Sequence, residues 1–191
     1  MSNDQLPMRV ASFDIVFQEI PGEVTLALNL SNCPCHCPGC HSPHLAEDIG
    51  EELNEELMDG LIARYGAMIT CVAFMGGDAA PDEVLRWAEY VKSQQLTARS
   101  DLQQLKTAWY SGRPSLPDSL TAKRSYSDNG LTALAVLQRS GLTYDYVKLG
   151  PYIESLGGLK SPTTNQRLYK RVGDQWQDIT SVFWKKSVFD Q

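Results

Sequence analysis

The sequence has no long apolar run and no cluster of basic residues. Its apolar runs reach only five residues, as at 133–137, whereas a membrane-spanning helix needs about 20. The net charge is −6, and Lys and Arg are nowhere dense enough to indicate a nucleic-acid-binding face. Residues 1–5 lack the basic start and the apolar stretch of a signal peptide. We therefore expect a cytoplasmic protein that binds neither nucleic acid nor a membrane.

Cysteine and histidine are also scarce, but nearly all of them lie in one short stretch. Four of the five cysteines follow one another closely: Cys33, Cys35, Cys37 and Cys40. All three histidines lie within residues 36–44. A disulfide framework would spread its cysteines along the chain, whereas a tight group of thiols in a cytoplasmic protein predicts a metal site. The remaining cysteine, Cys71, lies in an apolar segment and is expected in the core.

Segments that favour strands alternate with segments that favour helices. Apolar or alternating runs predict strands over residues 12–20, 24–30, 68–75, 105–110 and 144–149. Helices are predicted from a cap at Asn54 to residue 65, from Pro81 onward, and over residues 131–139. This alternation predicts the α/β class, with a parallel sheet and helices packed outside it. We expect either a small partial (β/α) barrel or an open, mostly parallel sheet.

A length of 191 residues suits a single domain. Its core is expected over residues 12–150, followed by an irregular C-terminal wrap over 151–191 that contains a hairpin joined at Gly173. Ligands in parallel sheets bind at the carboxyl ends of the strands. Three groups follow predicted strands in this way: the cysteine loop, Gly76-Gly77-Asp78, and Ser111-Gly112. We therefore expect them to share one site.

The spacing of three cysteines indicates what the metal is. Cys33, Cys37 and Cys40 are separated by three and then two residues. Three thiolates on one loop suit three irons of a cubane iron–sulfur cluster, and the fourth iron is then left without a protein ligand. Zinc, which also binds Cys and His, is the alternative, although the chain lacks the second pair of ligands that structural zinc sites usually have. Cys35 lies between the ligands and is expected to be a bystander.

This spacing resembles the motif of the radical S-adenosylmethionine superfamily. Within it, residues 33–44 are similar to the glycyl-radical-activating branch, and above all to activators of anaerobic ribonucleoside-triphosphate reductase. Gly39 stands before the last cysteine, where much of the superfamily has an aromatic residue. Asp78 stands where a glutamate is usual, as is common in the activating branch. Residues 163–167 continue the resemblance, which covers about residues 13–184.

The resemblance implies roles for the residues around the three cysteines. A [4Fe–4S] cluster on Cys33, Cys37 and Cys40 would bind S-adenosyl-L-methionine at its open iron. Seven further residues are then expected to contact this cofactor: Gly39 and His41 near the adenine, Gly76 and Gly77 through a close backbone, Asp78 at the methionine ammonium, and Ser111 and Gly112 at the ribose or methionine. No catalytic residue is expected beyond the cluster and the cofactor.

The implied activity is that of an activating enzyme. It would cleave S-adenosylmethionine reductively to a 5′-deoxyadenosyl radical, which takes a hydrogen from a glycine of anaerobic ribonucleoside-triphosphate reductase. A flavodoxin or ferredoxin would supply the electron. Three alternatives remain: an activator of another glycyl radical enzyme, a radical enzyme with a small-molecule substrate, and a non-catalytic zinc or electron-transfer module.

Overall fold

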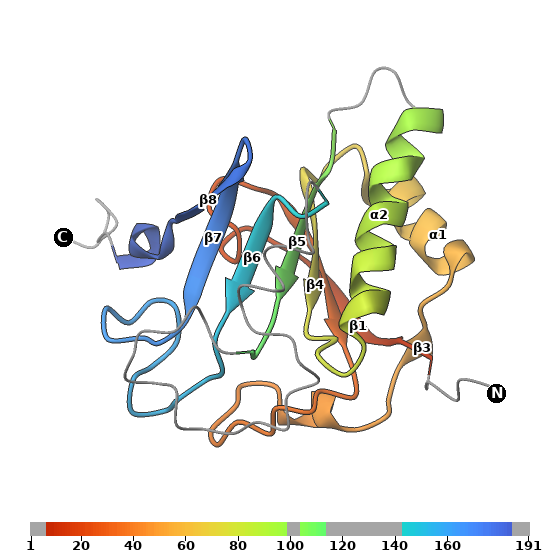
Figure 1. Ribbon diagram of the computed structural model, residues 1–191. Coiled ribbons are helices and arrows are strands. Elements are labelled where there is room, and N and C mark those ends of the chain that lie inside the picture. The colour runs from red at the N-terminus through yellow and green to blue at the C-terminus, as the bar shows by residue number, and fades with distance from the viewer. Residues whose placement is uncertain (1–6, 99–103, 114–142, 185–191) are drawn as a thin grey trace.

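The computed structural model describes residues 7–98, 104–113 and 143–184 of the chain (Figure 1). These residues form one eight-stranded sheet in the order β3-β1-β2-β4-β5-β6-β7-β8. The strands are β1 Arg9–Val16, β2 Thr25–Leu30, β3 Glu51–Glu52, β4 Cys71–Met75, β5 Lys106–Tyr110, β6 Tyr146–Leu149, β7 Arg167–Val172 and β8 Gln175–Asp178. The helices in the described residues are α1 Glu55–Tyr65, α2 Pro81–Ala98 and two 3-10 helices, η1 Pro43–Ala46 and η2 Thr180–Trp184.

The sheet is mixed, so the α/β class is confirmed but the prediction of a mostly parallel sheet is wrong. The strands β2, β4, β5 and β6 are parallel neighbours in the middle of the sheet. The pairs β1–β2, β1–β3, β6–β7 and β7–β8 are antiparallel and flank this centre on both sides. Residues 17–24, which turn at Pro21 and Gly22, join β1 to β2, and this connection is shorter than the dozen or more residues that a crossover between parallel strands needs.

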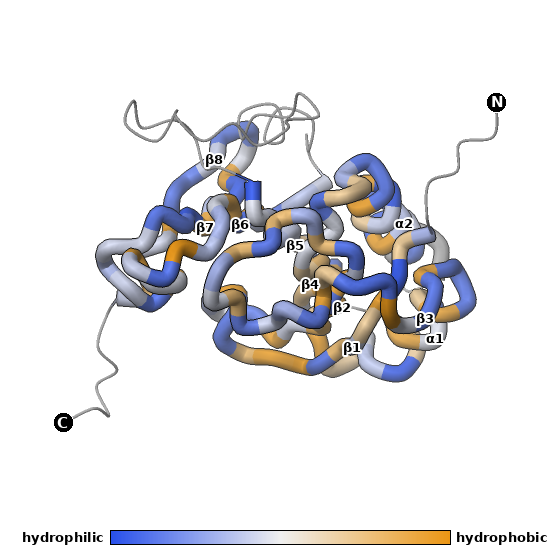
Figure 2. The backbone as a smooth tube through the Cα atoms, turned by 90° about the horizontal axis from the view of Figure 1, so that it is seen from below, coloured by the Kyte–Doolittle hydropathy of each residue, from blue (hydrophilic) through white to orange (hydrophobic). Residues whose placement is uncertain are grey.

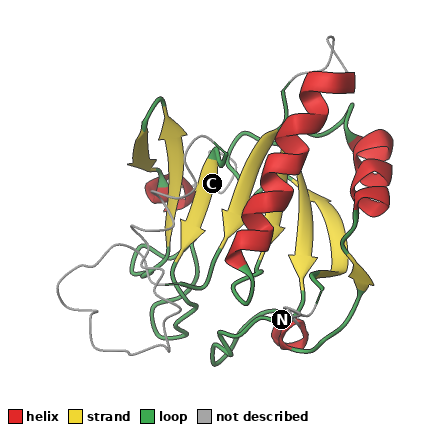
Figure 3. Cartoon of the chain, turned by 45° about the vertical axis from the view of Figure 1, so that its right-hand side comes forward, coloured by secondary structure: helices red, strands yellow, loops and turns green. Residues whose placement is uncertain are grey.

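Both α-helices pack on the same face of the sheet (Figure 3). Helix α1 begins as predicted, because the Asn54 side chain accepts a hydrogen bond of 2.9 Å from the backbone N–H of Leu57. Apolar residues of both helices, such as Leu61 and Trp87, share a core with Phe74 and Trp109 from the sheet. The helix predicted over residues 131–139 lies outside the described residues.

The C-terminal residues extend the sheet, which corrects the prediction of an irregular wrap. The hairpin itself is confirmed, since β7 and β8 are joined at Gly173, whose φ is 59°. However, β7 also pairs antiparallel with β6, in the register Val147 to Tyr169. The buried side chains of Leu168 and Tyr169 anchor β7 to the core, one on each face of the sheet. Residues 151–166 between β6 and β7 form the irregular part.

Hydrogen bonds to one buried carboxylate hold the amino ends of the parallel strands together. Glu23, just before β2, accepts hydrogen bonds from Lys106, Tyr146 and Thr70, which lie at or just before the starts of β5, β6 and β4. Burial alone would raise the pKa of Glu23, but these hydrogen bonds outweigh it and lower the pKa below its ordinary value of 4.5. The carboxylate is therefore charged at neutral pH and ties four strands.

The opposite, carboxyl ends of the parallel strands carry the loops of interest. The loop after β2, orange in Figure 1, and the loop after β6 lie at the same lower end of the sheet. Figure 2 views the molecule from this end and shows β2, β4 and β5 in the middle, with the loops around them. Among the described residues, no helix has both the length and the apolar character needed to cross a membrane.

Candidate metal centre

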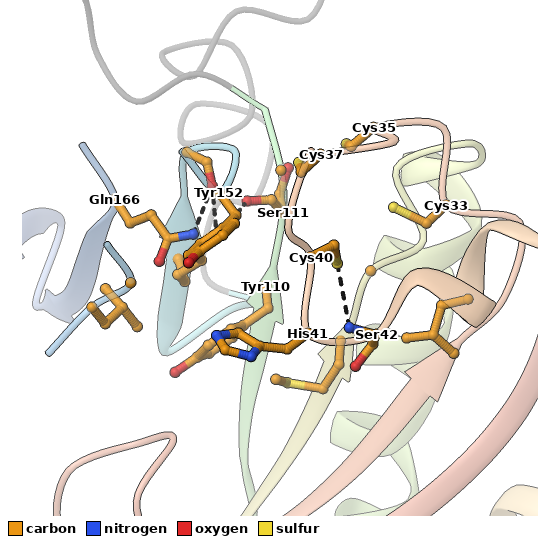
Figure 4. Close-up of a pocket in the computed structure, with 18 of the residues that line it drawn as sticks. Cys33, Cys35, Cys37, Cys40, His41, Ser42, Tyr110, Ser111, Tyr152 and Gln166 are labelled. Carbon is orange, nitrogen blue, oxygen red and sulfur yellow. Dashed lines mark hydrogen bonds between the residues drawn. The ribbon is translucent and has the colours of Figure 1, made fainter. Parts of the chain in front are cut away.

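A pocket of about 740 Å³ opens among the loops that follow the parallel strands. All four cysteines of the loop after β2 line it (Figure 4). Five of the seven residues predicted to bind the cofactor also line it, and they come from three different loops: His41, Gly76, Asp78, Ser111 and Gly112. Gly39 and Gly77 belong to the same loops but do not line the pocket. The structure thus brings the residues of all three predicted groups to one cavity.

The cysteine loop is closed at its base by backbone hydrogen bonds. The N–H groups of Asn32 and Cys33 donate to the carbonyls of Glu47 and Leu45, so the two ends of the loop lie side by side. Buried Leu45 anchors η1 beneath the loop. Asn32 and His36 have positive φ angles of 59° and 42°, which non-glycine residues adopt rarely. This backbone turns the thiols toward the pocket.

The closest potential ligands differ from the predicted set. Among the described residues, donor atoms of Cys33, Cys35 and Asp78 all lie within 4.8 Å of one another. A hydrogen bond with Cys35 lowers the pKa of Cys33 to about 7 against the effect of its burial. The same hydrogen bond, together with burial, raises the pKa of Cys35. Of these two thiols, Cys33 therefore loses its proton more readily. Cys35, expected from the sequence to be a bystander, lies among the groups that could bind a metal.

The other two cysteines have contacts of their own. Burial raises the pKa of Cys37, while a hydrogen bond from the backbone of Tyr152 opposes that effect. The sulfur of Cys40 accepts the backbone N–H of Ser42 at 3.4 Å. In Figure 4 Tyr152 lies to the left of the four labelled cysteines. Its backbone bonds to Cys37 and its ring lies beside that of His41, so the loop after β6 contacts the cysteine loop directly.

Asp78 connects the ends of β4 and β5. Its carboxylate accepts hydrogen bonds from Ser111 Oγ at 2.5 Å and from the Gly112 backbone N–H at 3.1 Å. Arg113 donates to its carbonyl oxygen at 3.0 Å and lies 3.8 Å from its carboxylate. Two predicted residues, Ser111 and Gly112, thus contact Asp78 directly. Each carboxylate oxygen can accept a second hydrogen bond, so the group can still bind a donor from the pocket.

The glycines let loops approach where a side chain would collide. Gly76 and Gly77 have φ angles of 102° and 82°, which favour glycine. A Cβ on Gly77 would lie 2.4 Å from Val84 Cγ2, so this glycine serves packing against α2. A Cβ on Gly112 would lie 2.5 Å from Cys35 Sγ. The absent side chain of Gly112 is what makes room for Cys35.

Sequence reasoning missed several residues of the pocket. Lys148 on β6 is buried, and its Nζ donates to the carbonyls of Gly150 at 2.7 Å and Ser111 at 3.4 Å. Burial lowers the pKa of Lys148 to about 8, although Asp78 and the cysteines act in the opposite direction. The sequence did contain one signal for Lys148: it is the single charged residue within the apolar segment that forms β6. Gln166 reaches the Gly150 carbonyl as well, at 3.4 Å.

The residues present fit a soft metal or an iron–sulfur cluster. Four thiols of one loop line the cavity, and thiolates are the ligands that iron–sulfur clusters and zinc prefer. Lys148 places a buried cation beside these groups, which offsets the negative charge that bound thiolates bring. The donor set alone does not distinguish a cluster from a single ion.

The chain was compared with protein family models, with curated proteins and with solved structures. None of the three comparisons finds a match. The resemblance to the radical S-adenosylmethionine enzymes therefore depends on residues 33–44, 76–78 and 163–167 of this sequence, and the family remains a prediction.

Proposed function

We propose that this protein is an iron–sulfur enzyme that cleaves S-adenosylmethionine reductively and activates a glycyl radical enzyme. The observation that carries the proposal is the loop with Cys33, Cys37 and Cys40, which lines one pocket together with Gly76 and Asp78. A three-cysteine loop leaves one iron of a cubane cluster open to an outside molecule. The parallel strands β2, β4, β5 and β6 would be the part of the sheet that corresponds to the superfamily's barrel.

In this proposal Cys33, Cys37 and Cys40 hold a [4Fe–4S] cluster, which when bound supplies the electron that breaks the carbon–sulfur bond of the cofactor. The chain's own residues bind and orient. Asp78, held by Ser111 and Gly112, offers its remaining lone pairs to the ammonium of the methionine moiety. The indole N–H of Trp109 donates to the Gly76 carbonyl at 2.7 Å and holds that backbone at the pocket wall.

The aromatic pair His41 and Tyr152 offers a place for an adenine ring. Their ring centroids are 5.4 Å apart at an interplanar angle of 55°, and both residues line the pocket. They connect the cysteine loop to the loop after β6. Thr163 and Thr164 shape that second loop, because their hydroxyls donate to the carbonyls of Leu156 and Gly157. The segment 163–167 thus supports the cofactor side of the pocket.

The proposed partners follow from the resemblance. The protein substrate is anaerobic ribonucleoside-triphosphate reductase, and a flavodoxin or ferredoxin supplies electrons. The proposal requires a reducing compartment such as the cytoplasm, where thiols remain free. An electron-spin-resonance signal of a glycyl radical on that reductase, dependent on this protein, reductant and S-adenosylmethionine, would test the partner.

The activity itself is tested by anaerobic reconstitution with iron and sulfide. We expect about four irons per chain, as in a cubane cluster, and release of 5′-deoxyadenosine after reduction with dithionite. Protein treated with zinc alone is the control. A chain that binds iron but releases no 5′-deoxyadenosine would contradict the proposed activity.

A mononuclear zinc site is the second candidate, and one observation favours it. Cys33, Cys35 and Asp78 already place three donor atoms within 4.8 Å of one another, which suits a tetrahedral ion with one further ligand. This candidate predicts about one zinc per chain and loss of zinc in a Cys35→Ala variant. The iron–sulfur proposal predicts that Cys35→Ala keeps its iron.

A further inference from the structure

Lys148 is a buried cation whose hydrogen-bond partners are neutral. Its ammonium donates to two backbone carbonyls, those of Gly150 and Ser111. A charge removed from water is costly unless an opposite charge compensates it. Two neutral carbonyls supply dipoles but no negative charge. A group of opposite charge is therefore expected close to Lys148.

Asp78 is the carboxylate of the pocket that acts most strongly on Lys148. The guanidinium of Arg113 lies 3.8 Å from the same carboxylate, so two cations share this one negative charge. Glu19, which also lines the pocket, is only partly buried. Lys160, the second lysine on the described part of the pocket wall, donates to Gln18 at 2.9 Å in an exposed position. The thiols of Cys37, Cys35 and Cys33 act on Lys148 in the same direction as Asp78, so thiolates at this cavity would supply the negative charge that Asp78 shares with Arg113.

Thiolate-bound clusters are anionic, and reduction adds further negative charge. A nearby cation in a site of low dielectric favours the more negative state, so it makes reduction easier. We propose that the Lys148 ammonium is the counter-cation of the bound cluster and sets how readily the site accepts an electron. This inference rests on the proposed function. It makes Lys148 a positioning residue that acts on the cluster through its charge.

The test is a reductive titration of anaerobically reconstituted protein with dithionite, followed by electron-spin resonance, without S-adenosylmethionine. Lys148→Met removes the charge, and Lys148→Gln removes it while keeping a donor for the Gly150 carbonyl. Both variants should lower the ratio of reduced to oxidised cluster at a given potential at least about tenfold, a shift of about 59 mV to more negative potential. Lys160→Met, which removes an exposed cation from the same wall, should change the ratio less than about twofold.

The possible results separate this inference from the proposed function. Iron that never binds to the wild-type chain would refute the proposed function itself. A cluster that assembles normally but has the same potential in all four proteins would refute only the role of Lys148. A shift in Lys148→Met that is absent in Lys148→Gln would show that the hydrogen bond matters rather than the charge, and it would equally overturn the inference. Should Lys148→Met fail to fold, Lys148→Gln alone decides.

Discussion

A methyl group on Gly112 tests the position of Cys35 without any metal. The Cβ of Gly112→Ala would lie 2.5 Å from Cys35 Sγ and 3.3 Å from Cys35 Cβ, well inside normal contact distance. The short Cys35 side chain must therefore rotate away, or the loop must shift. Overpacking of this kind costs about 1–3 kcal/mol of unfolding free energy. We expect that loss in urea unfolding of the metal-free, reduced protein, followed by circular dichroism.

The double variant shows whether Cys35 is the group that collides. Cys35→Ala removes the sulfur and leaves only the milder contact at 3.3 Å. In this background Gly112→Ala should be less damaging by about 1 kcal/mol, the usual size of coupling between residues in contact. Effects that add to within about 0.5 kcal/mol would mean the two residues do not touch, and the orientation of Cys35 toward the pocket would be refuted.

Three further changes test other parts of the molecule. Glu23→Gln should lower the free energy of unfolding by about 1–3 kcal/mol at pH 7. Because folding lowers the pKa of Glu23, the stability that its carboxylate contributes is present above the ordinary pKa of 4.5. In urea unfolding at a series of pH values, the difference in unfolding free energy between the variant and the wild type should therefore shrink as the pH falls below 4.5. Asn54→Ala removes the cap of α1 and should cost about 1 kcal/mol in thermal unfolding, with Asn54→Gly nearly neutral. Trp109→Phe loses the bond to the Gly76 carbonyl and should cost about 1–3 kcal/mol; an unchanged Tm would mean that this bond does not form.

Local patterns predicted most of the elements of the sheet. The apolar runs located β4, β5 and β6 to within three residues at their starts, and the hairpin at Gly173 was found from its turn residues. What sequence order could not supply is which strands pair. The antiparallel pairing of β6 with β7 crosses an irregular segment of residues 151–166, and no local pattern encodes a contact over that separation.

The sequence predicted which residues form the candidate site better than it predicted which of them touch one another. Loops that follow parallel strands lie at the same edge of the sheet. The sequence could therefore predict that Asp78 and Ser111 line one pocket with the cysteine loop. The orientation of Cys35 depends on the positive φ angles of Asn32 and His36. These angles could not be predicted from the sequence, because neither residue is glycine. Lys148 was missed because a lysine in a strand usually points to solvent.

The ligand set is the central claim, and metal analysis of single cysteine variants tests it most directly. Cys37→Ala and Cys35→Ala change residues of the same loop and the same pocket, so each is a control for the other. After anaerobic reconstitution, Cys35→Ala should retain about four irons per chain and release 5′-deoxyadenosine, whereas Cys37→Ala should do neither. Loss of iron in Cys35→Ala with retention in Cys37→Ala would contradict the account and favour a site built on Cys33, Cys35 and Asp78.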